Sequence, residues 1–205
     1  FGYDELRGDT AEGFLTSGDY VAWIAETDQT PKRWERLSAG FSAVYYWYRT
    51  SPYEMVPRQL ALRVTPTDPP ATEAGMHTVL LDTRGRLLQF NPAPPRFDPQ
   101  PPVEPASPPW PRLFQAAGLD LAAFSPVPPQ WNPRDYAAAR GAWEGPFADS
   151  GGTVRVEAAS YRGRPVSFAI VGPWTRPSRA QPLARPLADR IAFNVIRLGT
   201  LILVA

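Results

Sequence analysis

Apolar and polar residues alternate most clearly between residues 141 and 174. Residues 153–160 place apolar side chains at every second position, the period typical of a β-strand with one buried face. Residues 165–171 repeat that pattern, and Gly163 lies in the turn between them, where a positive φ suits glycine. Residues 141–147 form a further candidate strand just before this hairpin. The stretch therefore predicts three consecutive strands.

A second hairpin is predicted over residues 76–82 and 86–91, with Gly85 in the left-handed position of its turn. We expect this hairpin to be the sheet partner of the strands between residues 141 and 171. Residues 59–64 (QLALRV) are a sixth candidate strand, which ends at Thr65-Pro66.

A helical period follows Thr30-Pro31, a candidate N-cap with proline at the first helical position. Apolar residues then recur at intervals of three and four, which predicts an amphipathic helix over 31–49 that ends before Pro52. The residues on this period are Trp34, Leu37, Phe41, Val44, Tyr45 and Tyr48. A short helix is predicted over 111–117, with Gly118 just beyond its end. The apolar run 20–25 fits either a strand or a helix.

Proline is the outlier in the composition, with 26 residues in 205. Residues 91–111 contain ten of them, which predicts an extended connection; an intradomain crossing loop is favoured over a PxxP-type ligand because strands resume after it. The fold class expected is α+β. An antiparallel sheet of five to six strands would pack against one long and one short helix, with long proline-rich loops.

A ligand site is predicted in the groove between sheet and helix or on the solvent-facing side of the sheet. Four tryptophans are the candidate lining, and the arginines of the two Arg-Gly-Arg turns are candidates for binding phosphate or carboxylate. These residues are Trp47, Trp110, Trp131, Trp143, Arg84 and Arg162. Their alternative roles are ordinary ones, as core or rim aromatics and as solvated turn arginines.

Recognisable catalytic chemistry is absent from the sequence. The chain has no cysteine and one histidine, His77, and it lacks nucleophilic hydrolase, Walker A, Rossmann, zinc-protease and kinase motifs. No catalytic, metal or cofactor-binding residue is therefore assigned. Glu144 and Glu157 are the acids on the predicted central strands to inspect for an acid pair. The net charge of +1 gives no global attraction for nucleic acid.

The C-terminal region changes character after Trp174. Residues 175–190 form a basic, proline-rich linker, and residues 191–205 are almost wholly apolar. As a helix the apolar stretch would rise about 22 Å, short of the roughly 30 Å hydrocarbon core. It is either a terminal core element or the start of a transmembrane helix cut short. We favour the second, because basic residues precede it and because the chain begins at Phe1 without an initiator Met, as an excised piece would.

Several strings together resemble the extracytoplasmic region of large membrane-anchored bacterial serine/threonine kinases. They are LRGDTAEGFLTSGDYVAWIAETD, SPYEMVP, LLDTRGRLLQF, WPRLFQAAGLD, and GAWEG followed by RVEAASYRGRPVSFAIVGPW. In that family a cytoplasmic kinase domain precedes a membrane segment, a region like this one and further membrane helices. The resemblance implies a sensory or membrane-proximal domain, and it assigns no kinase residue to this chain.

The leading hypothesis is a non-catalytic extracytoplasmic (periplasmic) sensor or interaction domain, spanning residues 1–174, that biases a membrane-bound kinase. Its expected partners are the membrane, through the C-terminal segment, and an envelope ligand or protein. The alternatives are a structural membrane-proximal module without a ligand and an envelope enzyme that uses acidic residues. An apolar pocket with converging polar groups favours the first, a filled core the second, and a close acid pair in a cleft the third.

Overall fold

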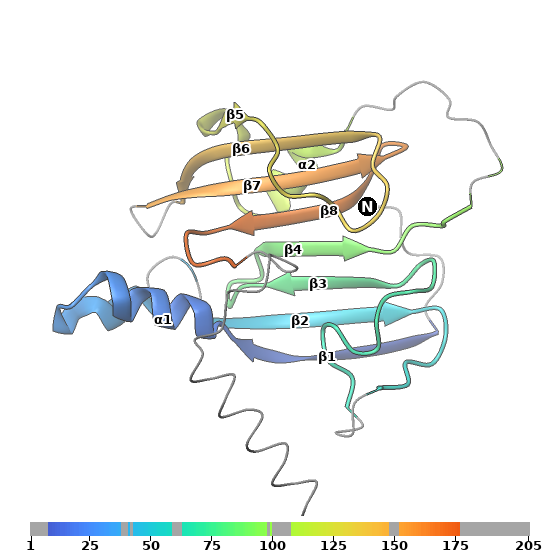
Figure 1. The fold of residues 1–205 in the computed structure, drawn as a ribbon, viewed down its shortest axis with the longest axis horizontal. Helices are drawn as coiled ribbons and strands as arrows, with labels where there is room; N and C mark the ends of the chain where they lie inside the picture. Colours follow the sequence, from blue (N-terminus) through green and yellow to red (C-terminus); the bar gives the residue numbers. More distant parts are fainter. Residues whose placement is uncertain are drawn as a thin grey trace, which may run out of the picture. The chain divides into compact units, whose positions relative to one another are not determined.

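The computed structural model describes residues 8–37, 41, 43–58, 63–97, 99, 108–147 and 152–176. Their centre is one antiparallel sheet of eight strands in the order β1-β2-β3-β4-β8-β7-β6-β5 (Figure 1). The strands are β1 (Asp9–Thr16), β2 (Val44–Ser51), β3 (His77–Leu81), β4 (Leu87–Pro92), β5 (Ser125–Val127), β6 (Ala139–Phe147), β7 (Gly152–Tyr161) and β8 (Arg164–Val171).

The helices are short. They are α1 (Gly18–Thr27), the 3₁₀ helix η1 (Pro31–Leu37), α2 (Trp110–Ala116) and the 3₁₀ helix η2 (Leu121–Ala123). The hydroxyl of Ser17 caps α1 by accepting a hydrogen bond from the amide of Tyr20 at 3.3 Å. The run 20–25, which fits a strand or a helix by its sequence, is therefore helical.

Both predicted hairpins form, and they share the sheet. Gly85 has φ 78° in the β3–β4 turn, and Arg162 and Gly163 have φ 50° and 71° in the β7–β8 turn. Two consecutive positive φ values match the twist of a two-residue hairpin connection. Strand β4 pairs with β8 through Phe90 and Phe168, so the expected pairing between the two hairpins is confirmed.

The predicted fold class is wrong in the number of strands and in the long helix. Residues 31–49 do not form one helix, because η1 ends at Leu37 and Val44–Ser51 is strand β2. The sequence of β2, VYYWYRTS, is rich in aromatic and β-branched residues that fit a pleated surface. Pairing of β2 on both sides, with β1 and β3, overrides the helical period.

Other differences concern the ends of the sheet. Strands β1 and β5 were not predicted, and both are edge strands. The predicted strand 59–64 lies outside the described residues at 59–62, and Arg63 and Val64 are not in a strand. The predicted short helix corresponds to α2, and Gly118 follows it with φ 66°.

The register defines two faces of the sheet. The pairs Phe168–Phe90, Phe90–Val79, Val79–Tyr48 and Tyr48–Glu12 place these side chains on one face, from β8 across to β1. Helix α2 packs on this face, since the ring of its Phe114 lies 6.5 Å from that of Phe168. We call it the helix face. Its β6–β8 half belongs to the main core, which also includes Leu113, Phe124, Val156 and Ile170.

The opposite face is crossed by two loops and is called the loop face (Figure 1). The loop between β2 and β3 approaches it through Arg49, whose guanidinium donates to the carbonyls of Thr65 (2.6 Å) and Pro69 (2.7 Å). Arg49 is 1% exposed, and burial lowers the pKa of its guanidinium. The loop between β5 and β6 covers the β6–β7 half, where the amide of Gln130 donates to Glu157.

The chain divides into two compact units, Phe1–Trp174 and Thr175–Ala205. Of the second unit, the structure describes only Thr175 and Arg176. The rest of the predicted linker and the predicted membrane segment 191–205 lie outside the described residues. Within the described part of the chain, no helix combines the length and the apolar character needed to cross a membrane.

Candidate functional site

The four tryptophans of the predicted groove do not come together. Trp110 of α2 and Trp143 of β6 are close, with ring centroids 5.6 Å apart, and Phe114 lies 5.3 Å from Trp143. These rings pack edge to face, as aromatic pairs in cores prefer. This pair closes one side of the main core.

Trp47 and Trp131 lie elsewhere. Trp47 of β2 is 3% exposed and points to the loop face, five strand spacings or about 24 Å from β6. Its indole lies over Gly13 of β1, where an added Cβ would approach Nε1 to 3.0 Å. Trp131 belongs to the loop before β6, and its carbonyl accepts a bond from Arg140. No single groove therefore carries all four side chains.

The two turn arginines lie at opposite ends of the sheet. Arg84 is in the β3–β4 turn, which Asp82 organises by accepting the amides of Arg84 and Arg86 at 2.8 Å and the Arg86 Nε at 2.6 Å. Arg162 is in the β7–β8 turn, with its guanidinium 5.6 Å from the ring centre of Tyr161. The antiparallel course of β4 and β8 separates these turns, so the arginines cannot bind one anion together.

The two candidate acids share one cation. Arg155 donates from Nη1 to Glu144 at 2.8 Å and from Nε to Glu157 at 2.6 Å, and its Nη2 donates to the carbonyl of Pro128. Burial opposes the charge on Arg155, but the bonds from both carboxylates outweigh it and raise the pKa of the guanidinium. The arrangement ties β6, β7 and the covering loop together, which suits a structural clamp better than an acid–base pair.

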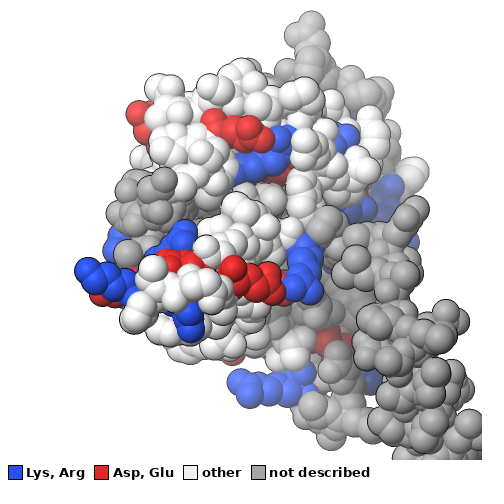
Figure 2. All heavy atoms as spheres, turned by 60° about the vertical axis from the view of Figure 1, so that its left-hand side comes forward, with Lys and Arg blue, Asp and Glu red and all other residues white. Residues whose placement is uncertain are grey.

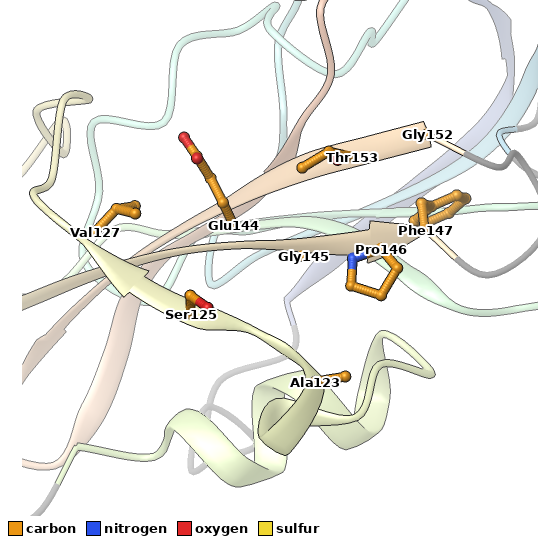
Figure 3. Close-up of a pocket in the computed structure, with 9 residues that line it drawn as sticks. All are labelled: Ala123, Ser125, Val127, Glu144, Gly145, Pro146, Phe147, Gly152 and Thr153. Atoms are coloured by element: carbon orange, nitrogen blue, oxygen red, sulfur yellow. The ribbon is translucent and has the colours of Figure 1, made fainter.

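Two of the depressions on the described surface are lined partly by polar side chains. The larger, of about 580 Å³, is formed by β5 and the ends of β6 and β7, and Glu144, Ser125 and Thr153 are its polar lining residues (Figure 3). The smaller, of about 230 Å³, includes Tyr136 and Tyr161, whose rings lie 5.6 Å apart. Since the Glu144 carboxylate already pairs with Arg155, the larger depression offers no unengaged charged group among its described lining residues.

The remaining candidates are ordinary structural groups. His77 lies on β3, with Thr50 Oγ1 at 3.0 Å from its ring nitrogens. Among the described residues, no three His, Cys, Asp or Glu side chains are close enough to hold a metal ion. On the face seen in Figure 2, acidic and basic side chains lie next to one another and form no broad area of one sign.

Exposed apolar side chains lie next to one another where β1 and β2 meet on the helix face. Phe14 is 71% exposed and Val44 is 37% exposed, and Phe14 contacts Tyr46 edge to face at 5.6 Å. The Tyr46 hydroxyl donates to the carboxylate of Glu12. We call Glu12, Phe14, Val44 and Tyr46 the edge patch. Large apolar side chains that cluster at an exposed edge mark interaction surfaces more often than scattered ones do.

The two polar residues of the edge patch, Glu12 and Tyr46, hold each other in place. The hydrogen bond to Glu12 raises the pKa of the Tyr46 hydroxyl, with burial adding to the effect. The hydroxyl therefore remains a donor over the neutral range, and it fixes the carboxylate beside Phe14. No strand was predicted for residues 9–16, whose sequence DTAEGFLT carries only a weak strand pattern. Thr10 and Glu12 are exposed between half-buried neighbours, but Phe14, Leu15 and Thr16 are all exposed.

Comparison of the chain with protein-family models, with curated proteins and with solved structures found no match.

Proposed function

We propose that this domain is a non-catalytic extracytoplasmic interaction domain of a membrane-anchored bacterial serine/threonine kinase, and that it biases kinase signalling through the edge patch. The sequence strings that resemble that family support the assignment to a kinase. Engagement of Glu144 and Glu157 with Arg155 supports a role in binding over one in catalysis.

The observation that carries the proposal is the exposure of the edge patch at the edge of the sheet. Phe14 presents most of its ring to solvent, whereas Phe168 on the same face is fully buried under α2. A solvent-facing aromatic costs a free monomer some of the hydrophobic stabilisation that burial would give. A partner that covers the patch recovers it, and aromatic side chains are enriched among residues that dominate binding.

Phe14→Glu in the full-length membrane protein is expected to change kinase autophosphorylation at least several-fold. The change should be opposite in sign to the change in autophosphorylation that partner binding produces. The stability of the domain should change by only about 0.5 kcal/mol, because exposed substitutions rarely do more. Autophosphorylation in native membranes and thermal unfolding of the purified chain measure the two quantities.

Val56→Glu is the matched control, since Val56 is 64% exposed and lies outside the edge patch. It should leave kinase output unchanged. Equal output from the wild-type, Phe14→Glu and Val56→Glu proteins would favour a purely structural domain. A reading frame around this chain that encodes no kinase domain would exclude the proposed parent protein.

A further inference from the structure

The backbone of β1 has an unpaired outer edge among the described strands. In an antiparallel pair, alternate residues direct both N–H and C=O toward the same neighbour. The amide of Ser17 donates to the carbonyl of Ala43 at 2.8 Å, and this pair continues the β1–β2 register. Odd-numbered residues of β1 therefore bond to β2. The even-numbered residues, Thr10, Glu12, Phe14 and Thr16, direct their backbone groups outward.

The two edges of the sheet differ in how they resist further pairing. Strand β5 has three residues, and its middle residue is Pro126, which has no N–H to donate. Strand β1 has eight residues and no proline. Short strands and prolines are the usual protection of a sheet edge, and β1 has neither. Pairing through β1 would stop at two copies, because the β5 edges cannot extend the sheet.

We propose that β1 pairs with β1 of a second copy of this chain, antiparallel across a two-fold axis, to join two eight-stranded sheets into one. A two-fold contact uses the same surface on both copies, so donors and acceptors on the outer edge match by symmetry. This inference rests on the proposed function and deepens it, because it identifies the partner of the edge patch as a second copy.

The side chains select one register. Alignment of Glu12 with the second copy's Glu12 sets like charges opposite each other, which destabilises a strand pair. Alignment of Phe14 with the second copy's Phe14 leaves Thr10 without a partner. Alignment of Glu12 with the second copy's Phe14 also aligns Thr10 with its Thr16. In this register each of the four outward residues has a partner directly opposite. The amide of Thr10 is already bonded to the Asp9 carboxylate at 2.8 Å, so its carbonyl is the group left to pair.

The same register covers the edge patch. All four outward residues point their side chains to the helix face, so each Phe14 ring meets the Glu12 carboxylate of the other copy. The edge of an aromatic ring carries partial positive charge, which suits a carboxylate neighbour. The net charge of +1 per chain produces little repulsion between copies.

Disulfide trapping tests both the partner and the register, and the chain has no native cysteine to interfere. Thr10→Cys and Thr16→Cys chains, mixed and treated with a mild oxidant, are expected to form a mixed disulfide dimer. Directly paired residues have Cα atoms about 5.5 Å apart, within the range that a disulfide spans. Each variant alone should yield several-fold less dimer, because two copies of one position lie six residues or about 20 Å apart.

Adding Phe14→Glu to both cysteine chains should abolish the mixed dimer, because it sets like charges opposite each other at the Glu12 positions, and adding Val56→Glu should preserve it. Equal trapping in mixed and single samples, no trapping at all, or trapping that survives Phe14→Glu would each overturn the inference. Sedimentation of the 205-residue chain provides a cysteine-free check, and a monomer at every concentration would also overturn it. Trapping in the expected register without any effect of Phe14→Glu on kinase output would reject the proposed function and leave the dimer standing.

Discussion

Phe168→Ala is expected to lower the free energy of unfolding by about 3–5 kcal/mol, the cost of removing a fully buried aromatic ring from a packed core. The Phe168 side chain is 0% exposed, pairs across the sheet with Phe90 on one side and Ala158 on the other, and lies beneath Phe114 of α2. It is thus the point at which both hairpins and the helix meet. Chemical denaturation of the purified chain measures the change.

Phe97→Ala is the matched control, because Phe97 is 79% exposed, and it should change stability by no more than about 0.5 kcal/mol. The loss of stability in Phe168→Leu should lie between those of Phe168→Ala and Phe97→Ala, since leucine fills part of the cavity that alanine leaves. A cost below about 1 kcal/mol for Phe168→Ala would mean that β4 and β8 are not held together by this core.

Arg155→Ala is expected to cost about 3–5 kcal/mol, because it leaves the carboxylate of Glu157 buried without its cation. The side chain of Glu157 is 7% exposed, and the Pro128 carbonyl loses its donor as well. Denaturation at neutral pH measures the loss.

Glu144→Ala should cost much less than Arg155→Ala, because the Glu144 side chain is 48% exposed and water can replace its partner. The double variant Arg155→Met with Glu157→Leu should recover much of the lost stability, as apolar replacements of buried ion pairs often do. An Arg155→Ala variant with an unchanged free energy of unfolding would contradict the structural clamp. Glu144 and Glu157 would then again be candidates for catalytic acids.

The hairpins and their turns could be predicted from the sequence because local rules determine them. Gly85 and Gly163 lie at the turn positions that need a positive φ, and the strands around them alternate with period two. Helix α2 was predicted for the same kind of reason, with Pro111 in its first turn and Gly118 after its end.

Strand β2 could not be predicted because its sequence fits two periods. Tyr45 and Tyr48 match a helical interval, but Tyr46, Tyr48 and Thr50 also lie on one face of a strand. Pairing with β1 and β3 decides between them, and residues 77–81 lie far along the chain. Non-local pairing of this kind is not expressed in a local pattern.

The candidate site was missed for a related reason. Tryptophans are common in ligand sites, so they were predicted to line one groove. The register instead places Trp47 on the loop face and Trp143 on the helix face. Phe14 gains significance only because β1 is at the end of the sheet, which depends on the order of all eight strands.

Amide hydrogen exchange of β1 at low and high protein concentration shows whether the outer edge of β1 binds a second copy. The amides of Ala11, Gly13 and Leu15, which bond to β2, should be protected at both concentrations. Those of Glu12, Phe14 and Thr16 should exchange quickly in dilute chain and become protected by at least tenfold as the concentration rises. Fast exchange of these outward amides at every concentration would exclude the contact between the two β1 strands.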